Sequence, residues 1–145
     1  MTREFRLTPR HLSAELNRTL AAARIVNIVG PRQAGKTTFV RDLFGSEQTG
    51  AKFVTLDDAD LLAAIENDPA GQLSALMQDI GDNPLIIDEA QRSKKMALTI
   101  KKIVDENRRK GQFILTGSSN VFTTLEVADS LAGRMRTIKL WPMTV

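Results

Sequence analysis

Two hydrophobic patterns alternate along this chain: short continuous apolar runs, and longer stretches in which apolar residues return every three or four positions. Continuous runs bounded by turn residues are typical of strands buried on both faces, whereas the wider spacing is typical of amphipathic helices. The runs predict strands at residues 24–29, 52–56, 85–89, 112–116 and 136–141. The wider spacing predicts helices at residues 11–23, 39–44, 58–65, 69–80, 93–110 and 121–132. This alternation predicts an α/β fold, with a mostly parallel sheet and helices on both faces.

Local residues mark where several of these elements begin and end. Asp57 and Asp58 place carboxylates at the start of one helix, and Pro69 either breaks the helical pattern or opens a new helix. Gly111 is expected to end the helix that runs to residue 110. Residues 1–10 are polar, and we interpret them as a lead-in to the first helix.

The residues after the first predicted strand fit the pattern G-x-x-x-x-G-K-[ST] of a phosphate-binding loop. They are Gly30, Pro31, Arg32, Gln33, Ala34, Gly35, Lys36, Thr37 and Thr38. The two glycines allow the backbone N–H groups to turn toward an anion, and the following helix points its positive N-terminus at the same place. Lys36 is expected to reach the β- and γ-phosphates of a nucleotide, and the Thr37 hydroxyl to bind Mg²⁺. A purely structural turn would need neither side chain.

Two acidic residues close the third predicted strand. Asp88 follows an apolar run, as the acid of a Walker B motif does, and is expected to hold Mg²⁺ through its water shell beside Thr37. Glu89 is the candidate base that polarises a water for in-line attack on the γ-phosphate. The alternative is that both acids only cap the next helix; a phosphate loop upstream, with a strand between, favours the metal site.

Composition limits the class of protein and its partners. The 145 residues include no cysteine, which excludes disulfides and thiol chemistry. No apolar run reaches membrane-spanning length and the first residues lack the apolar core of a signal peptide, so we expect a cytoplasmic protein without membrane contact. The net charge of +3 permits nucleic-acid contact without arguing for it. The basic residues at 94–110 are either solvated surface or a contact with nucleic acid or a partner.

Four short motifs occur in a fixed order. They are Gly-Pro-Arg-Gln-Ala-Gly-Lys-Thr-Thr, Ile-Asp-Glu-Ala-Gln, Leu-Thr-Gly-Ser-Ser and Ser-Leu-Ala-Gly-Arg. Together they resemble the AAA-type ATPase domain of the prokaryotic AAA_14 family, whose members usually continue into a C-terminal domain named DUF4143. The resemblance runs from about Arg10 to Thr144 and implies ATP, rather than GTP, as the nucleotide.

The resemblance also implies a fold and further site residues. A strand between the loop strand and the Walker B strand, with a glutamate after the aspartate, is similar to the additional-strand catalytic-glutamate class of ATPases. That class implies a three-layer α/β/α P-loop NTPase with five strands in the order 5-1-4-3-2. In AAA-type ATPases a polar residue after the fourth strand senses the γ-phosphate, so Ser118 is either such a sensor or a helix cap. Arg134 either stabilises the transferred phosphate or is a solvated residue after a glycine, and Arg32 either contacts phosphate or lies on the surface.

We therefore expect residues 1–145 to form a single P-loop ATPase domain, with residues 1–23 as a helical lead-in. Its cofactors are ATP and Mg²⁺, its catalytic residues Glu89, Lys36 and Arg134, and its metal ligands Thr37 and Asp88. The family's second domain, or a partner protein, is expected to be missing from this chain, and the sequence leaves both a monomer and an oligomer open. One alternative is a nucleotide-dependent switch or interaction module with negligible hydrolysis on its own. Another is a small-molecule phosphotransferase, although no arginine-rich lid segment is evident.

Overall fold

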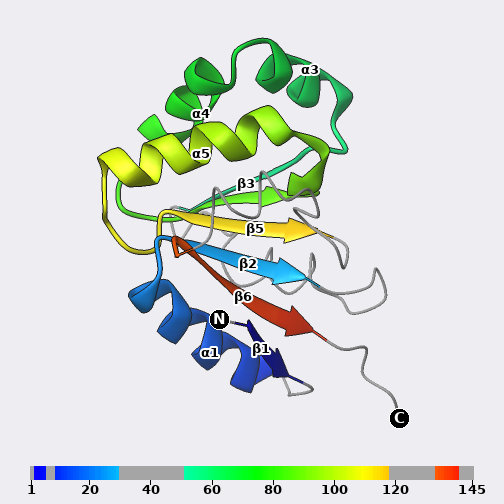
Figure 1. The fold of residues 1–145 in the computed structure, drawn as a ribbon. Helices are drawn as coiled ribbons and strands as arrows, with labels where there is room; N and C mark the ends of the chain where they lie inside the picture. The colour runs from blue at the N-terminus through cyan, green and yellow to red at the C-terminus, as the bar shows by residue number, and fades with distance from the viewer. Residues whose placement is uncertain (1, 6–8, 30–50, 118–132, 141–145) are drawn as a thin grey trace.

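The predicted alternation of strands and helices is present in the computed structural model, which describes residues 2–5, 9–29, 51–117 and 133–140 (Figure 1). The elements in chain order are β1 (Thr2–Phe5), α1 (Pro9–Ala22), β2 (Ile25–Val29), β3 (Lys52–Thr55), α3 (Ala59–Asn67), α4 (Pro69–Gln78), β4 (Leu85–Asp88), the 3-10 helix η2 (Ala90–Arg92), α5 (Lys94–Glu106), β5 (Phe113–Gly117) and β6 (Met135–Leu140). The phosphate loop, the helix predicted after it and residues 118–132 lie outside the described residues.

Every pair of neighbouring strands is parallel, and the strand order is β1-β6-β2-β5-β4-β3. Over the five predicted strands, this is the order 5-1-4-3-2 that the family resemblance implied, and that prediction is confirmed. The register aligns the strand ends, since Val29 lies opposite Gly117 and Thr55 lies opposite Asp88. We call the side on which the strands end the carboxyl edge and the opposite side the amino edge. Open parallel sheets bind their ligands at the carboxyl edge.

The sheet has a sixth strand that the sequence pattern did not predict. Residues 1–10 were expected to be a lead-in, whereas Thr2–Phe5 forms β1 and pairs with β6, with Thr2 opposite Thr137. A strand of four residues with polar neighbours carries no apolar run from which it could be recognised. Its pairing satisfies backbone groups that β6 would otherwise leave open at the outer side of the sheet.

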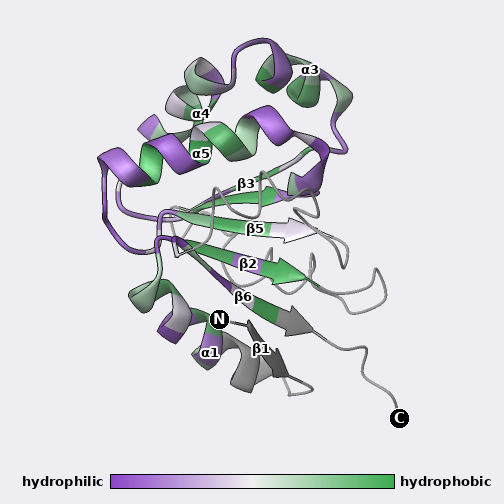
Figure 2. Ribbon diagram, in the orientation of Figure 1, coloured by the Kyte–Doolittle hydropathy of each residue, from purple (hydrophilic) through white to green (hydrophobic). Residues whose placement is uncertain are grey.

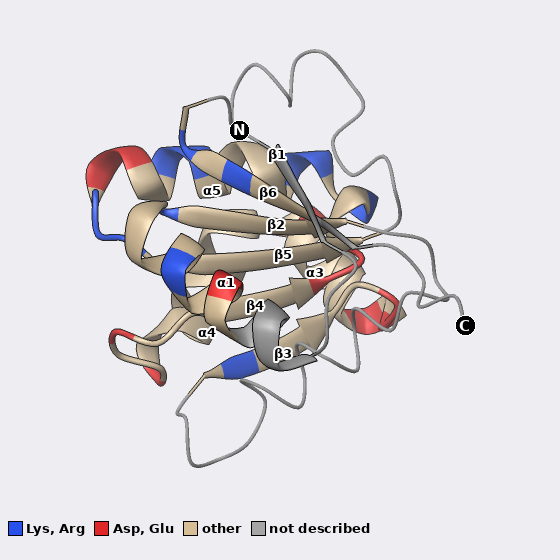
Figure 3. Cartoon of the chain, turned by 90° about the horizontal axis from the view of Figure 1, so that it is seen from below, with Lys and Arg blue, Asp and Glu red and all other residues tan. Residues whose placement is uncertain are grey.

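Helices cover both faces of the sheet, which makes the described part of the chain a three-layer structure. Helices α3, α4 and α5 lie on one face and α1 lies on the other (Figures 1 and 3). In Figure 2, β2 and β3 are largely green, whereas α5 alternates between green and purple along its length. Strands β2, β4 and β5 are buried on both faces, β3 is half-buried, and the helices are buried on one face only, as the two sequence patterns indicated for the central strands and the helices.

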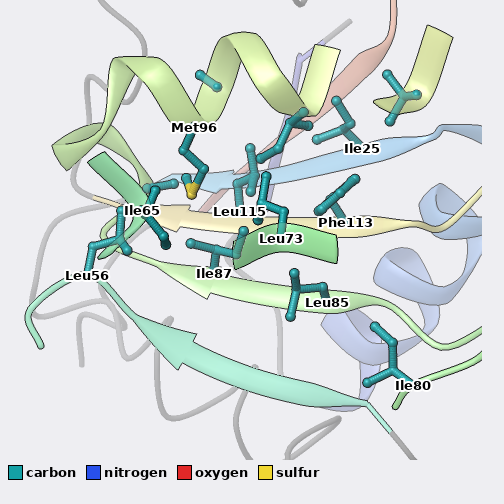
Figure 4. Packing of buried hydrophobic residues seen from close by; sticks show 14 residues of the cluster. Ile25, Leu56, Ile65, Leu73, Ile80, Leu85, Ile87, Met96, Phe113 and Leu115 are labelled. Atoms are coloured by element: carbon teal, nitrogen blue, oxygen red, sulfur yellow. The ribbon is translucent and has the colours of Figure 1, made fainter. Parts of the chain in front are cut away.

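Each face of the sheet has its own hydrophobic cluster. The larger cluster joins strand side chains such as Ile87, Phe113 and Leu115 to Met96 of α5 and Leu73 of α4 (Figure 4). The smaller cluster packs Leu16 of α1 against alternate strand residues, Val26, Ile28, Ile86, Ile114 and Ile138. Alternation along each strand sends neighbouring side chains to opposite clusters, so the sheet is held in place from both sides.

Side-chain caps set most helix boundaries. The Asp58 carboxylate accepts hydrogen bonds from the N–H groups of Asp60 and Leu61, so this residue caps α3 as predicted. Asp68 caps α4, in which Pro69 is the first residue, and this resolves Pro69 as a helix opener. Both contacts satisfy N–H groups that the first turn of a helix leaves without partners.

The predicted helix at 93–110 is shorter than expected. Helix α5 ends at Glu106, and Asn107 takes an extended backbone. The side-chain amide of Gln112 donates hydrogen bonds to the carbonyls of Asn107 at 2.6 Å and Arg109 at 2.8 Å. These hydrogen bonds give the two carbonyls partners without another turn of helix. Gly111, with φ 71°, lies in the turn that leads into β5 and does not end α5, which corrects the prediction.

Candidate functional site

The acidic pair lies where the sequence predicted it, at the carboxyl edge. Asp88 is the last residue of β4 and exposes 6% of its surface. The Thr116 hydroxyl on β5 donates to its Oδ1 at 2.7 Å, and the Thr55 hydroxyl on β3 donates to its Oδ2 at 2.9 Å. The neighbouring strand on each side thus holds one oxygen of the same carboxylate.

The strand register explains this arrangement. Strands β3, β4 and β5 are neighbours, and each ends its apolar run with a polar side chain. The N–H of Leu56 also donates to the Asp88 carbonyl at 3.0 Å, which fixes the backbone beneath the carboxylate. A buried carboxylate without such donors would be costly, so the threonines stabilise the acid where it stands.

The chemistry of this acid fits a hard divalent cation. After accepting one hydroxyl, each carboxylate oxygen keeps further acceptor capacity. Mg²⁺ prefers oxygen ligands, retains several waters, and is commonly held by one or two carboxylates together with phosphate groups. Within the described ranges, no three His, Cys, Asp or Glu side chains gather as a metal cluster. Asp88 therefore fits a magnesium site of this water-rich kind rather than an all-protein metal cage.

Glu89 follows directly and has an unusual backbone. Its φ of 56° and ψ of 42° lie in the left-handed region, and it is the one non-glycine residue with positive φ in the described part of the chain. Such conformations cost about 1–3 kcal/mol in bulky residues and concentrate at functional sites. The side chain is nearly buried, at 9% exposure. The strained backbone thus keeps a second carboxylate beside Asp88.

Gln91 restrains the Glu89 side chain. Its Nε2 donates a hydrogen bond to Glu89 Oε2 at 2.6 Å. Its Oε1 is buried and has no hydrogen-bond partner among the residues that the structure describes. A buried amide oxygen without a partner is an acceptor available to a ligand or a water. Gln91 therefore places one donor on the candidate base and one acceptor next to it.

Arg134 does not belong to this constellation. It directly precedes β6, and its carbonyl accepts the N–H of Ile25 at the start of β2, so it lies at the amino edge. A strand of five residues spans about 16 Å, which separates Arg134 from Asp88 by the length of the sheet. Its guanidinium Nε and Nη2 both donate to the Asp105 carboxylate. A catalytic role for Arg134 toward the Asp88 site of its own chain is therefore not supported by this geometry, which corrects the prediction.

The phosphate-loop residues and Ser118 lie outside the described residues, but their neighbours in sequence do not. Strand β2 ends at Val29, one residue before Gly30, and β5 ends at Gly117, one residue before Ser118. Val29 and Gly117 lie opposite each other in adjacent strands. The chain therefore enters both predicted segments from the carboxyl edge. The phosphate-loop sequence follows β2, and Ser118 follows β5, the strand that lies between β2 and the Asp88 strand β4.

Sequence reasoning missed Thr55 and Gln91. Thr55 carried one signal, since a polar residue ended an apolar strand, but its partner Asp88 lies 33 positions away. Gln91 lay within a quoted motif, yet only the tight turn through Glu89 and η2 brings the two side chains together.

The sheet is all-parallel and has the strand order of P-loop NTPases. Asp88 ends β4, which is separated from the loop strand β2 by one strand, β5. These features define the class of P-loop NTPases. Residues 22–145 match the family of AAA domains named AAA_14, and the chain belongs to that family. It is therefore an AAA domain of the nucleotide-binding kind.

Two curated relatives are uncharacterized protein Rv2008c of Mycobacterium tuberculosis and uncharacterized protein Mb2031c of Mycobacterium bovis. Each is 34% identical over 136 residues, which cover 94% of this chain and 29% of the relative. The chain thus spans less than a third of their length. Among solved structures, PCH-2 of C. elegans is similar with a TM-score of 0.48 and 15% identity, over 90% of this chain and 41% of that one. No helix within the described ranges has the length and apolar character needed to cross a bilayer.

Proposed function

We propose that this domain binds ATP with Mg²⁺ and hydrolyses it. One observation carries the proposal: a buried carboxylate, Asp88, is held by hydroxyls from both neighbouring strands at the edge where the chain enters its phosphate-loop sequence. The threonines would also stabilise a purely structural acid, but such an acid would not need a second, nearly buried carboxylate at the next position of the chain, as Glu89 is. This arrangement is the one expected for a magnesium-nucleotide site.

The residues take separate roles in the proposed reaction. Lys36 and the amides of the loop from Gly30 to Thr38 bind the phosphates, and Thr37 and Asp88 hold the metal. Bound Mg²⁺ supplies positive charge that offsets the charge on the phosphates. Glu89 accepts a proton from the water whose oxygen attacks the γ-phosphorus, while the bond from that phosphorus to the ADP oxygen breaks.

Other predicted residues keep narrower roles in the proposal. Ser118 is a candidate sensor of the γ-phosphate, two positions after Thr116 in the sequence, and Thr116 contacts Asp88. Arg32 is a candidate phosphate contact. For Arg134 the proposal is a role at the site of a neighbouring copy, because in its own chain it lies at the opposite edge of the sheet from Asp88. A second domain or a partner protein belongs to the same proposal, because the chain covers only 29% of the curated relatives that it matches.

The test combines calorimetry of Mg²⁺-ATP binding with phosphate release. We expect Lys36→Ala to abolish both, because the loop loses its charge toward the β- and γ-phosphates. Glu89→Gln should keep binding but lower release by about 10²–10⁴-fold, the usual contribution of a general base. Lys102→Ala, which removes a lysine on the exposed side of α5, serves as the matched control. Unchanged release in Glu89→Gln with intact binding would show that Glu89 is not the base.

A nucleotide-dependent switch with negligible hydrolysis on its own is the second candidate. The hydrogen bond of 2.6 Å from Gln91 to Glu89 favours it, because the base is already engaged inside the chain. In that case, ATP should protect backbone amides from hydrogen exchange without phosphate release. Gln91→Ala would then raise release, since it frees the carboxylate. Rapid turnover by the wild-type chain alone would contradict the switch.

A further inference from the structure

The amino edge of the sheet gathers basic residues from three separate segments of the chain. A pocket of about 370 Å³ opens there, and four basic residues line it: Arg24, Lys110, Arg134 and Arg136. We call it the basic pocket. Its described lining includes no acidic residue. The pocket lies at the opposite end of the strands from Asp88, so it is separate from the proposed nucleotide site.

Backbone hydrogen bonds fix the three segments relative to one another. The N–H of Gly111 donates to the Ala23 carbonyl at 2.8 Å, and the N–H of Gln112 donates to the Arg24 carbonyl at 3.0 Å. On the other side, the N–H of Ile25 donates to the Arg134 carbonyl at 3.2 Å. The frame of the basic pocket is therefore continuous with the strand pairing of the sheet.

One carboxylate behind the pocket orients two of its arginines. Arg134 donates from Nε and Nη2 to Asp105, the second contact at 3.1 Å, and Arg24 Nη1 lies 3.7 Å from the same carboxylate. Arg24 also donates to the Val104 carbonyl at 3.3 Å. Two guanidinium charges surround one carboxylate, so the group keeps a net positive charge. Ordered guanidinium groups lose less entropy when they bind an anion.

The basic character continues beyond the pocket. The loop after α5 adds Arg108 and Arg109 to Lys110, as Figure 3 shows in blue. Arg109 donates to the Asp82 carbonyl at 2.8 Å and lies 3.8 Å from the Asp82 carboxylate, whereas Arg136 and Lys110 are exposed. A polyanion with regularly repeated charges can contact such a path at several points.

The chemistry of the pocket favours phosphodiesters over an acidic protein segment. Arginine matches phosphate with paired hydrogen bonds. Protein–protein contacts need an apolar core, whereas nucleic-acid contacts are polar and strongly positive, as this pocket is. Its described lining includes no aromatic side chain, so these residues offer nucleobases no stacking platform. We propose that the basic pocket binds the phosphodiester backbone of a nucleic acid without reading its sequence.

The test measures the binding of labelled single-stranded oligonucleotides, oligothymidine and a mixed sequence, by fluorescence anisotropy as the salt concentration rises. The variant Lys110→Ala/Arg136→Ala removes two exposed contacts, and Lys95→Ala/Lys102→Ala removes the same charge from α5 as a control. We expect the first pair to weaken the binding of both oligonucleotides about tenfold or more and to reduce the salt slope by about 1.4, the value for two contacts to a single strand. The control should keep the wild-type slope. Thermal unfolding verifies that each variant is folded.

Several outcomes would overturn the proposal. We expect the wild type to bind at low salt; no binding at low salt, or an equal loss in both variant pairs, contradicts a defined site. Polyglutamate binding with equal affinity and equal sensitivity to the first pair would assign the pocket to an acidic protein instead. Displacement of the oligonucleotide by Mg²⁺-ATP would indicate that the oligonucleotide binds at the carboxyl edge and not at the basic pocket. The test does not depend on hydrolysis, so it stands apart from the proposed function.

Discussion

The two edges of one sheet handle charge in opposite ways. At the carboxyl edge, Asp88 and Glu89 are nearly buried, and neutral hydroxyl and amide groups hold their oxygens. At the amino edge, the cations have partly or fully exposed side chains; Asp105 orients two of them, and Asp82 lies 3.8 Å from Arg109. The first edge fixes the positions of a few atoms, whereas the second spreads positive charge over a surface.

This difference follows from the direction of the strands. In a parallel sheet all strands end on one side, so side chains from neighbouring strands converge there at short range. The amino edge receives chain segments from loops and a helix end, which bring long basic side chains to solvent. The carboxyl edge is therefore suited to chemistry at fixed distances, and the amino edge to electrostatic contact. Four measurements test whether the two edges differ in this way.

The largest expected effect is that of Asp88→Asn. This change keeps the shape of the side chain but removes its charge, so we expect the Mg²⁺ concentration needed for nucleotide binding to rise about 10–100-fold. Calorimetry at several Mg²⁺ concentrations measures it. Oligonucleotide binding at the basic pocket should stay unchanged. A parallel loss of oligonucleotide binding would show that the two edges do not act separately.

Salt should separate the two edges next. With four phosphate contacts at the basic pocket, raising salt from about 50 to 200 mM should weaken oligonucleotide binding about 50-fold. Binding at the nearly buried carboxyl edge is screened less, so Mg²⁺-ATP affinity should change by less than about tenfold. Anisotropy and calorimetry in the same buffers provide the two slopes. Equal slopes would contradict the contrast.

Thr116→Val tests how firmly Asp88 is held. Valine has nearly the same shape but removes the hydroxyl that donates to Asp88 Oδ1 at 2.7 Å, and Thr116 is fully buried. We expect the free energy of unfolding to fall by about 1.5–3 kcal/mol, as for a hydrogen bond to a charged group. Thr99→Val, at a threonine whose hydroxyl donates to the Lys95 carbonyl on α5, is the control and should change stability by about 0.5 kcal/mol or less. Similar losses in both variants would mean that Asp88 does not depend on this hydroxyl.

The smallest effect concerns the pH dependence of the amino edge. The hydrogen bond from Arg134 lowers the pKa of Asp105, and the nearby charges of Arg134, Lys101 and Arg24 act in the same direction. A carboxyl whose pKa is lower in the folded state contributes stability above its unfolded pKa and loses it as the pH falls through the folded value. We expect an NMR titration to place the pKa of Asp105 below its ordinary value, and Arg134→Ala to raise it. An Asp105 pKa at or above the ordinary value would show that the pair does not form in solution.

Much of the carboxyl edge was predictable from local sequence. Strand β4 is a continuous apolar run because it is buried on both faces, and Asp88 ends that run. Asp58 and Pro69 marked helix starts through contacts within a few residues of chain. The strand order came from the family resemblance, since hydrophobic periodicity contains no information about which strands are neighbours.

The rest depended on contacts between distant segments. Strand β1 exists because β6 lies beside it, and Thr55 serves the site because the register sets it opposite Asp88. The basic pocket combines three segments that lie far apart in the chain, and no local sequence pattern predicted that they meet. Local periodicity, capping and motif spacing in the sequence therefore predicted the elements other than β1, and the chemistry at their ends. Which charged residues share a site depends on strand pairing between distant segments, so this grouping is evident only from the tertiary structure.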